Sequence, residues 1–117
     1  MKVAVKTGSK QMIGTVRSLL TELKRGIEGL YDERLRAVYL YGSHARGDQE
    51  QGSDVDVLIV LGHIDSYGSE IDRTSELVSS LSLQYDLSIR RVFVTEEAWL
   101  GAQSTFLSKV REEALDA

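Results

Sequence analysis

The sequence predicts an α/β domain in which a small mixed β-sheet is flanked by helices, in the order helix, strand, helix, strand, helix, strand, helix. Three observations carry this prediction: an amphipathic segment from Gln11 to Tyr31, a short apolar run from Ala37 to Tyr41, and a longer apolar run from Val55 to Leu61. With 117 residues, of which 42% are hydrophobic, the chain has the size of one core. We therefore expect a single domain over residues 1–117.

The first segment has the spacing of an amphipathic helix. Between Gln11 and Tyr31, apolar residues recur three and four positions apart, at Ile13, Val16, Leu20, Leu23, Ile27 and Leu30. This spacing places one apolar stripe along a helix. The stripe is shorter than three heptads, which favours packing on the domain's own sheet over a coiled coil with a partner.

The run from Ala37 to Tyr41 has the length and the β-branched and aromatic content of a short buried strand. Gly42 then allows a sharp turn and lets a ligand approach the main-chain amides. Ser43 is a good N-cap for a short helix over residues 44–47. The free amides at its start would face an anion such as phosphate.

The second apolar run begins with two aspartates. Asp54 and Asp56 share one face of the expected strand with Leu58 and Val60, and the remaining apolar residues cover the other face. Such a strand is covered on both sides, and its two carboxylates emerge at one end. Paired carboxylates suit Mg²⁺, which also takes phosphate oxygens and water. An Asp-x-Asp pair alone is typical of a solvated turn, but its place after a strand and a Gly-Ser turn favours the metal.

The second half of the chain continues the alternation. Residues Ser69 to Leu83 have helical spacing, Leu87 to Val94 form a third strand, and Ser104 to Leu115 form a last helix. Thr95 is expected to be an N-cap residue, with two glutamates following it in the first turn. The residues expected to face inward are Ile71, Ser75, Val78 and Leu81 in the first of these helices, and Leu107, Val110 and Ala114 in the last.

Composition excludes several classes of protein. The net charge of −4 argues against direct nucleic-acid binding, which normally uses a basic surface. Cysteine is absent, which excludes disulfides, thiolate zinc sites and a cysteine nucleophile. No apolar run has the length of a membrane span, and the N-terminus has no sustained apolar segment. We expect a soluble cytoplasmic protein with no membrane contact.

The central motif resembles a known signature. Gly42-Ser43, ten intervening residues and Asp54-Val55-Asp56 match the pattern of the minimal nucleotidyltransferases in the DNA polymerase β-like superfamily, and Ala45-Arg46-Gly47 fits its usual wording. The resemblance implies a Mg²⁺-dependent transfer of AMP, or another nucleoside monophosphate, from ATP or another NTP to a hydroxyl. It also implies that Gly42 and Ser43 cradle the triphosphate, that Arg46 offsets its charge, and that Asp54 and Asp56 hold magnesium.

Members of this superfamily typically carry a third carboxylate on the third strand, as a further metal ligand and catalytic residue. Asp86 is the candidate, since a parallel strand beginning there would place it at the same end of the sheet as Asp54 and Asp56. An alternative alignment puts Ser88 in that place, which implies an impaired enzyme.

Four other polar residues have open assignments. Arg46 is expected to contact phosphate, and its alternative is an ion pair with Asp48. Arg90 and Arg91 alternate across the third strand, so one should face the same side as the aspartates and the other a helix or solvent, with a structural salt bridge as the expected role. We expect His44 to be a bystander.

The acceptor is expected on another molecule, because little of the chain remains beyond the sheet and its helices. The resemblance points to the antitoxin branch, in which the nucleotidyltransferase pairs with a small helical HEPN-domain ribonuclease toxin and silences it by adding AMP to a tyrosine. Two alternatives stay open. One is a catalytically weak subunit that neutralises its partner by contact, and the other is an aminoglycoside-type enzyme that builds its acceptor pocket between two chains of an oligomer.

Overall fold

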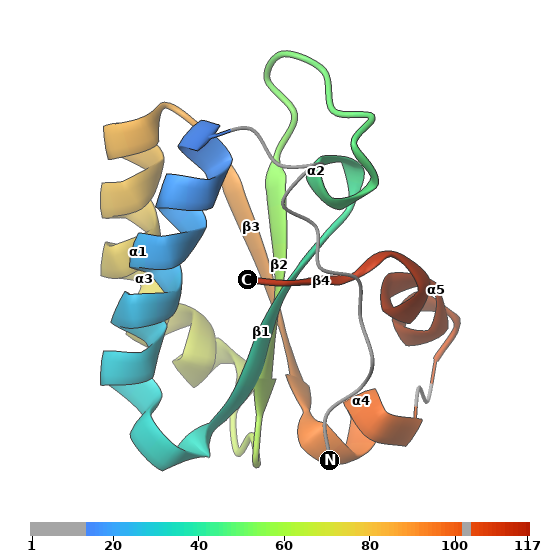
Figure 1. Cartoon of the computed structure of the whole chain (residues 1–117). Helices are drawn as coiled ribbons and strands as arrows, with labels where there is room; N and C mark the ends of the chain where they lie inside the picture. Colours follow the sequence, from blue (N-terminus) through green and yellow to red (C-terminus); the bar gives the residue numbers. More distant parts are fainter. Residues whose placement is uncertain (1–13, 102–103) are drawn as a thin grey trace.

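A computed structural model describes residues 14–101 and 104–117 and contains one mixed four-stranded sheet in the order β3-β2-β1-β4 (Figure 1). The central strand pair β1 and β2 is antiparallel, β2 and β3 are parallel, and β4 pairs antiparallel with β1. This confirms the expected mixed sheet and the parallel arrangement of the second and third strands. The strands are β1 (Leu35–Tyr41), β2 (Val55–Leu61), β3 (Ile89–Thr95) and β4 (Leu115–Asp116).

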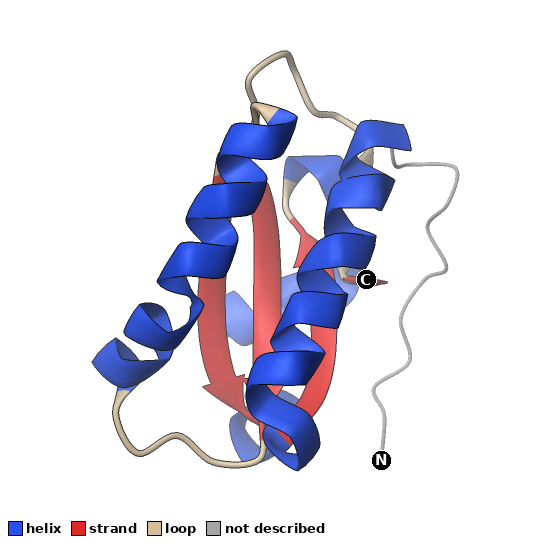
Figure 2. Cartoon of the chain, turned by 90° about the vertical axis from the view of Figure 1, so that its left-hand side faces the viewer, coloured by secondary structure: helices blue, strands red, loops and turns tan. Residues whose placement is uncertain are grey.

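Helices cover both faces of the sheet. The two long helices lie side by side over one face (Figure 2), and the two C-terminal helices lie over the other (Figure 1). The long helices are α1 (Gly14–Tyr31) and α3 (Tyr67–Tyr85), and the C-terminal ones are α4 (Glu96–Gly101) and α5 (Thr105–Glu113). Two short elements, η1 (Asp32–Arg34) and α2 (Ser43–Arg46), flank β1. Within the described residues, no helix combines the length and apolar character needed to cross a membrane.

The stripe expected on α1 is mostly confirmed. Its buried residues are Val16, Leu19, Leu20, Leu23, Ile27 and Tyr31. Ile13 lies outside the described residues. The assignment of Leu30 was wrong, since this side chain is 39% exposed. Neighbouring residues of a helix point about 100° apart, and Tyr31 takes the inward direction at this end of α1.

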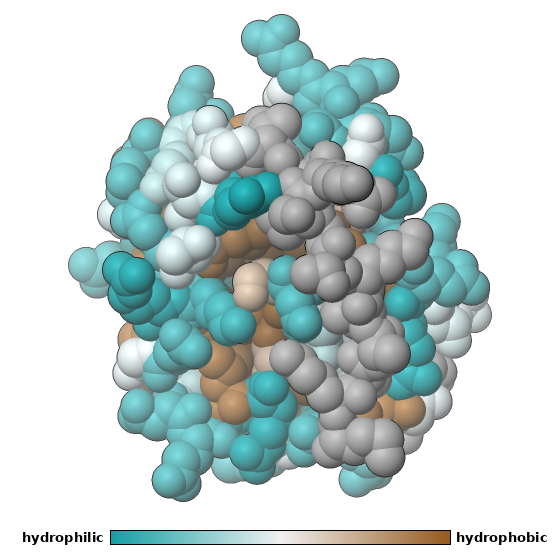
Figure 3. Space-filling view, viewed as in Figure 1, coloured by the Kyte–Doolittle hydropathy of each residue, from teal (hydrophilic) through white to brown (hydrophobic). Residues whose placement is uncertain are grey.

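Strand β2 is buried along its whole length, as expected from its double cover. Val55, Val57, Ile59 and Leu61 join the core cluster beneath α1 and α3. Leu58 and Val60 join a second cluster beneath α4 and α5, which contains Tyr39 and Trp99. On the face of the molecule seen in Figure 1, hydrophilic residues dominate the outline and apolar residues lie nearer the centre (Figure 3).

The inward face of α3 differs from the expected one. Ser75 is exposed and Ile71 only partly buried, whereas Glu70, Thr74, Val78 and Leu81 face the core. The reason is a polar network that the apolar pattern does not reveal. Tyr31 Oη donates to Glu70 Oε1 at 2.8 Å, Arg34 Nη1 donates to Glu70 Oε2 at 2.6 Å, and Arg91 Nε donates to Thr74 Oγ1 at 2.6 Å.

Two boundaries in the second half also shift. The third strand begins at Ile89 instead of Leu87, because α3 extends to Tyr85. The expected last helix ends at Glu113, because residues 115–116 pair with β1 as β4. The cap at Thr95 is confirmed, since its Oγ1 accepts from Ala98 N at 3.2 Å. α4 therefore separates β3 from α5.

Candidate active site

The turn after β1 requires glycine. Gly42 has φ +78°, and a Cβ atom at this position would collide with the Asp56 carboxylate. The absence of a side chain at Gly42 therefore lets the backbone approach the Asp56 carboxylate closely. The expected cap is off by one residue: Gly42 is the N-cap, without a side-chain cap bond, and Ser43 is the first residue of α2.

The two aspartates lie beside this turn. The sheet register pairs Tyr41 with Asp56, so the second carboxylate stands next to the end of β1. The Asp56 side chain is 8% exposed and that of Asp54 36% exposed. The pair thus combines a buried carboxylate, fixed by the sheet, with an open one at the mouth of the site.

An arginine on β3 stands beside both carboxylates. The parallel register pairs Asp56 with Arg90. Arg90 Nε donates to Asp56 Oδ1 at 2.8 Å and lies 3.4 Å from Asp54 Oδ2. The hydrogen bond to Asp56 and the charges of both acids raise the pKa of Arg90 further above its usual range. The sequence prediction for this residue pair is confirmed, because Arg90 faces the aspartates and Arg91 bonds to α3.

The structure does not bring Asp86 to the other two aspartates. Asp86 is the exposed C-cap of α3, in the left-handed conformation with φ +52°, and precedes the start of β3 by three residues. The expectation of a strand-leading acid was incorrect because the helix extends further than its apolar spacing suggested. Within residues 14–101 and 104–117, no three acids or histidines form a group that could hold a metal ion. Ser88 is exposed and its carbonyl accepts from Val55 N at 2.8 Å.

A cleft of about 440 Å³ opens over Gly42, Asp56 and Arg90. It lies between the Gly42 turn, the start of β2, Arg90 and the face of α5 that carries Phe106, Lys109 and Glu113. Tyr41 forms part of its wall, with its ring edge-on to Phe106 at a centroid distance of 5.7 Å. Burial, followed by the charge of Asp56, raises the pKa of Tyr41 to about 12, so its hydroxyl stays protonated at neutral pH.

The cleft contains an anion-binding arrangement that is filled by an internal carboxylate. Glu113 Oε2 accepts from the backbone N–H of Gly42 at 3.0 Å and from Arg46 Nη1 at 2.7 Å. Arg46 Nε donates to Asp48 Oδ2 at 3.1 Å, so the alternative ion pair is present as well. We call the Gly42 amide and the Arg46 guanidinium the anion cradle. Sequence reasoning missed Glu113, which reads as one more charge on a solvated helix face.

His44 stabilises the loop between the turn and β2. It is 3% exposed, and its Nε2 lies 3.1 Å from the carbonyl oxygen of Ser53. The contact joins the first and last residues of the ten-residue interval. His44 therefore acts on the shape of the motif, away from the carboxylate pair.

The chemistry of the donor set fits one divalent cation. Asp54 and Asp56 offer hard oxygen ligands at one side of an open cleft, where substrate phosphates would complete the coordination of Mg²⁺. Arg90 shares these oxygens in the structure, but its side chain is 65% exposed and has room to adjust. Two carboxylates of the kind that could hold a cation thus lie near the anion cradle.

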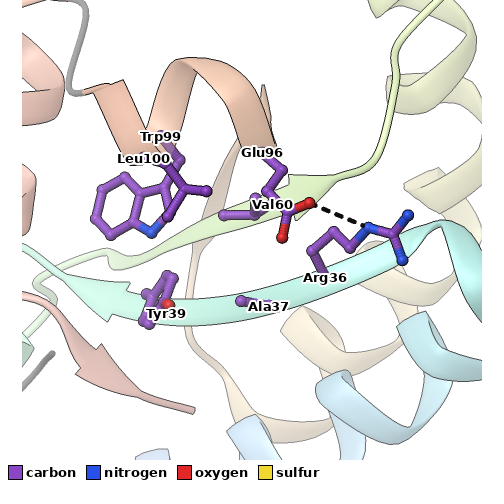
Figure 4. Close-up of a pocket in the computed structure, with 7 residues that line it drawn as sticks. All are labelled: Arg36, Ala37, Tyr39, Val60, Glu96, Trp99 and Leu100. Atoms are coloured by element: carbon purple, nitrogen blue, oxygen red, sulfur yellow. Dashed lines mark ion pairs between the residues drawn. The ribbon is translucent and has the colours of Figure 1, made fainter. Parts of the chain in front are cut away.

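A second cavity, of about 330 Å³, lies between α4 and the strands β1 and β2 (Figure 4). Its wall contains two aromatic rings in contact, Tyr39 and Trp99, whose centroids are 5.0 Å apart and whose planes are tilted by 35°. Its rim carries one ion pair, with Arg36 Nε 3.5 Å from Glu96 Oε1. With a single acid in its wall, this cavity lacks the paired carboxylates of the first.

Comparisons with known proteins agree on one family. The model of the nucleotidyltransferase domain matches residues 20–113. "Putative protein adenylyltransferase MJ0141" of Methanocaldococcus jannaschii is 37% identical over 71 residues, which are 61% of this chain and 71% of that protein. "Putative protein adenylyltransferase MJ0604" of the same organism is 33% identical over 78 residues, covering 67% of this chain and 72% of that protein.

Solved structures share the fold. A crystal structure named as a putative nucleotidyltransferase from Sulfolobus solfataricus has a TM-score of 0.63 at 18% identity, over 97% of this chain and 87% of that one. A toxin–antitoxin complex with AMP-PNP gives 0.52 at 22% identity, over 84% of this chain and 66% of that one. A mutant of the toxin–antitoxin pair MntA–HpeT gives 0.54 at 19% identity, over 87% and 70%.

Proposed function

This chain belongs to the family of nucleotidyltransferase domains, and from that premise we propose that it transfers AMP from ATP to a hydroxyl group of a partner protein. In this reaction the acceptor oxygen forms a bond to the α-phosphorus, the bond to pyrophosphate breaks, and the hydroxyl proton is released. The observation that carries the proposal is the position of Asp56 beside the Gly42 turn, in the wall of a cleft of about 440 Å³, with Asp54 next to it through their shared contact to Arg90.

The side chains of the cleft divide the work of binding. Asp54 and Asp56 would hold Mg²⁺, which supplies charge neutralisation at the phosphates during transfer. The Gly42 amide and the Arg46 guanidinium would bind phosphate oxygens in place of the Glu113 carboxylate that they now hold, and the Ser43 amide would join them. Asp86, at the end of α3, has no part in this arrangement. The chain contributes positioning and preorganised charge more than covalent chemistry.

The names of the similar proteins support a protein acceptor. Two relatives from M. jannaschii are named as protein adenylyltransferases, and two structures of the same fold are toxin–antitoxin complexes. We therefore take the acceptor to be a tyrosine on a small helical HEPN-type ribonuclease, which the chain silences as an antitoxin. The site suits such an acceptor, since Asp54 and Arg90 lie at its exposed side.

The test uses the purified chain, ATP, Mg²⁺ and a small helical HEPN-type ribonuclease as the candidate acceptor. Intact-mass spectrometry should show the helical partner gaining the mass of AMP, with loss of its ribonuclease activity. Asp54→Asn/Asp56→Asn should abolish this gain. A folded pair without any AMP-sized increase contradicts the proposal.

One observation favours a second candidate, neutralisation by contact alone. Arg90 already pairs with both aspartates, as a structural salt bridge would. In that case the Asp54→Asn/Asp56→Asn variant still inhibits the ribonuclease, because inhibition needs only the interface. Transfer of AMP to a free aminoglycoside without any protein partner would instead indicate a small-molecule enzyme.

A further inference from the structure

Arg90 occupies the place where a third carboxylate would stand. The parallel register sets residue 90 directly beside Asp56, and neighbouring paired residues of a sheet point to the same face. A carboxylate at that position would stand directly beside Asp56. Asp86 lies before the strand, and the side chain at the position itself is a cation.

This exchange changes the charge that the site can hold. Three carboxylates with two divalent ions carry a net charge of about +1. Two carboxylates, one guanidinium and one divalent ion carry the same charge of about +1, whereas a second divalent ion would raise it to about +3 at short range. The residues present therefore match one divalent ion together with Arg90.

The geometry of Arg90 suits a phosphate contact. Its contacts to Asp54 and Asp56 both run through Nε, and its side chain forms part of the cleft wall with Ser43 and Lys109. Among the hydrogen bonds of the described residues, the one that Arg90 donates to the aspartates leaves from Nε, and none leaves from Nη1 or Nη2. A guanidinium held by a carboxylate on one edge presents its other edge as a fork for phosphate oxygens.

We propose that Arg90 replaces the second cation of the site: the chain binds one divalent ion between Asp54 and Asp56, and Arg90 contacts the nucleotide's phosphates. The phosphate contact rests on the proposed function of the cleft. The number of cations depends only on the residues around Asp56.

The number of cations is tested with Mn²⁺ and α,β-methylene-ATP, an analogue that cannot transfer AMP. Equilibrium dialysis with metal analysis measures Mn²⁺ per bound analogue. The wild-type chain should hold one, and Arg90→Asp, which supplies the third carboxylate, should hold two. Arg25→Asp makes the same change of net charge on the exposed side of α1 and should leave the count at one.

The phosphate contact is tested with Arg90→Gln, which keeps a polar side chain and adds no metal ligand. Its affinity for the analogue should fall about tenfold, as expected for loss of a charged phosphate contact, while the count stays at one Mn²⁺. Circular dichroism and thermal unfolding are used to check that each variant is folded.

The outcomes separate this inference from the proposed function. Two Mn²⁺ per analogue in the wild type, a count of one in folded Arg90→Asp, or unchanged affinity in Arg90→Gln would overturn the inference and leave the transferase proposal standing. A folded wild-type chain that binds neither Mn²⁺ nor the analogue would overturn both.

Discussion

Two clusters of acids and arginines lie at opposite ends of the sheet, and they differ in how far they are closed to water. The closed network consists of Tyr31, Arg34 and Glu70, near the start of β1 and the end of β2. The open network contains Asp54, Asp56 and Arg90 at the start of β2 and β3. The side chain of Arg34 is 19% exposed, whereas that of Arg90 is 65% exposed.

In the closed network the Glu70 carboxylate has its hydrogen-bond partners within the chain. Glu70 receives hydrogen bonds from the Tyr31 hydroxyl and from both terminal nitrogens of Arg34. Burial, assisted by the hydrogen bond to Glu70, raises the pKa of Tyr31 above its usual range. The open network keeps its arginine at a cleft where a ligand can enter. We therefore expect the same kind of ion pair to serve stability in the closed network and ligand binding in the open one.

The largest expected effect is a loss of stability in Glu70→Ala. The change leaves the buried Tyr31 hydroxyl without its acceptor and leaves the partly buried Arg34 guanidinium with the His63 carbonyl but without its carboxylate, at a cost of about 3 kcal/mol of the free energy of unfolding. Urea denaturation measures it. The matched control is Asp54→Asn/Asp56→Asn, which should change the free energy of unfolding by about 1 kcal/mol or less, because the amides retain the shape of the site. Equal losses in both variants would erase the contrast between the two networks.

The next effect is the dependence of stability on pH. Hydrogen bonds from Arg34, followed by that from Tyr31, hold the pKa of Glu70 below its ordinary value of 4.5. A carboxyl whose pKa is lowered in the folded state stabilises the fold at pH values above the pKa that the group has in the unfolded state. This contribution is lost as the pH falls through 4.5 and below. The free energy of unfolding of the wild type should therefore decline in this window.

Glu70→Gln removes that titration, so its stability should depend less steeply on pH in the same acid window. Its loss in the free energy of unfolding should be smaller than that of Glu70→Ala, because the amide oxygen still accepts a hydrogen bond from Tyr31. Thermal unfolding between neutral and acid pH gives both curves. Parallel curves for the two proteins would show that Glu70 does not report on the closed network.

The smallest expected effect concerns the open network. Glu113→Gln weakens the carboxylate that competes with phosphate for the Gly42 amide and Arg46, so the Kd for ATP should fall about three- to tenfold. Isothermal titration calorimetry with ATP and Mg²⁺ measures the change. Glu112→Gln alters the adjacent exposed residue of α5 and should leave the Kd unchanged. Weaker binding in Glu113→Gln would mean that this carboxylate assists the nucleotide.

The sequence predicts those parts of the site that are local. The buried strand β2, the glycine turn and the shared direction of Asp54 and Asp56 follow from spacing and alternation, and the structure has all three. The closed network escapes such reading, because a glutamate in a helix normally faces water and only Tyr31 and Arg34, nearly forty residues earlier, make Glu70 a buried residue.

The remaining differences have the same origin in distant contacts. Arg46 and Glu113 are 67 positions apart, and the local sequence around either residue does not predict their ion pair. Asp86 fails as a strand residue because the helix boundary is set by a single left-handed cap, which no periodicity encodes. The place of Arg90 beside Asp56 depends on the register between two parallel strands, which the sequence leaves open.

The short strand β4 has a consequence for how fast Glu113 can leave the anion cradle. It begins at Leu115, two residues after Glu113, and its pairing with Tyr39 and Leu40 ties the end of α5 to the sheet. Glu113 can leave the anion cradle by rotating its side chain, without departure of the helix. Movements of whole elements take microseconds or longer, and the rotation of one side chain is a smaller movement. Release of Glu113 from the cradle should therefore be faster than a displacement of α5.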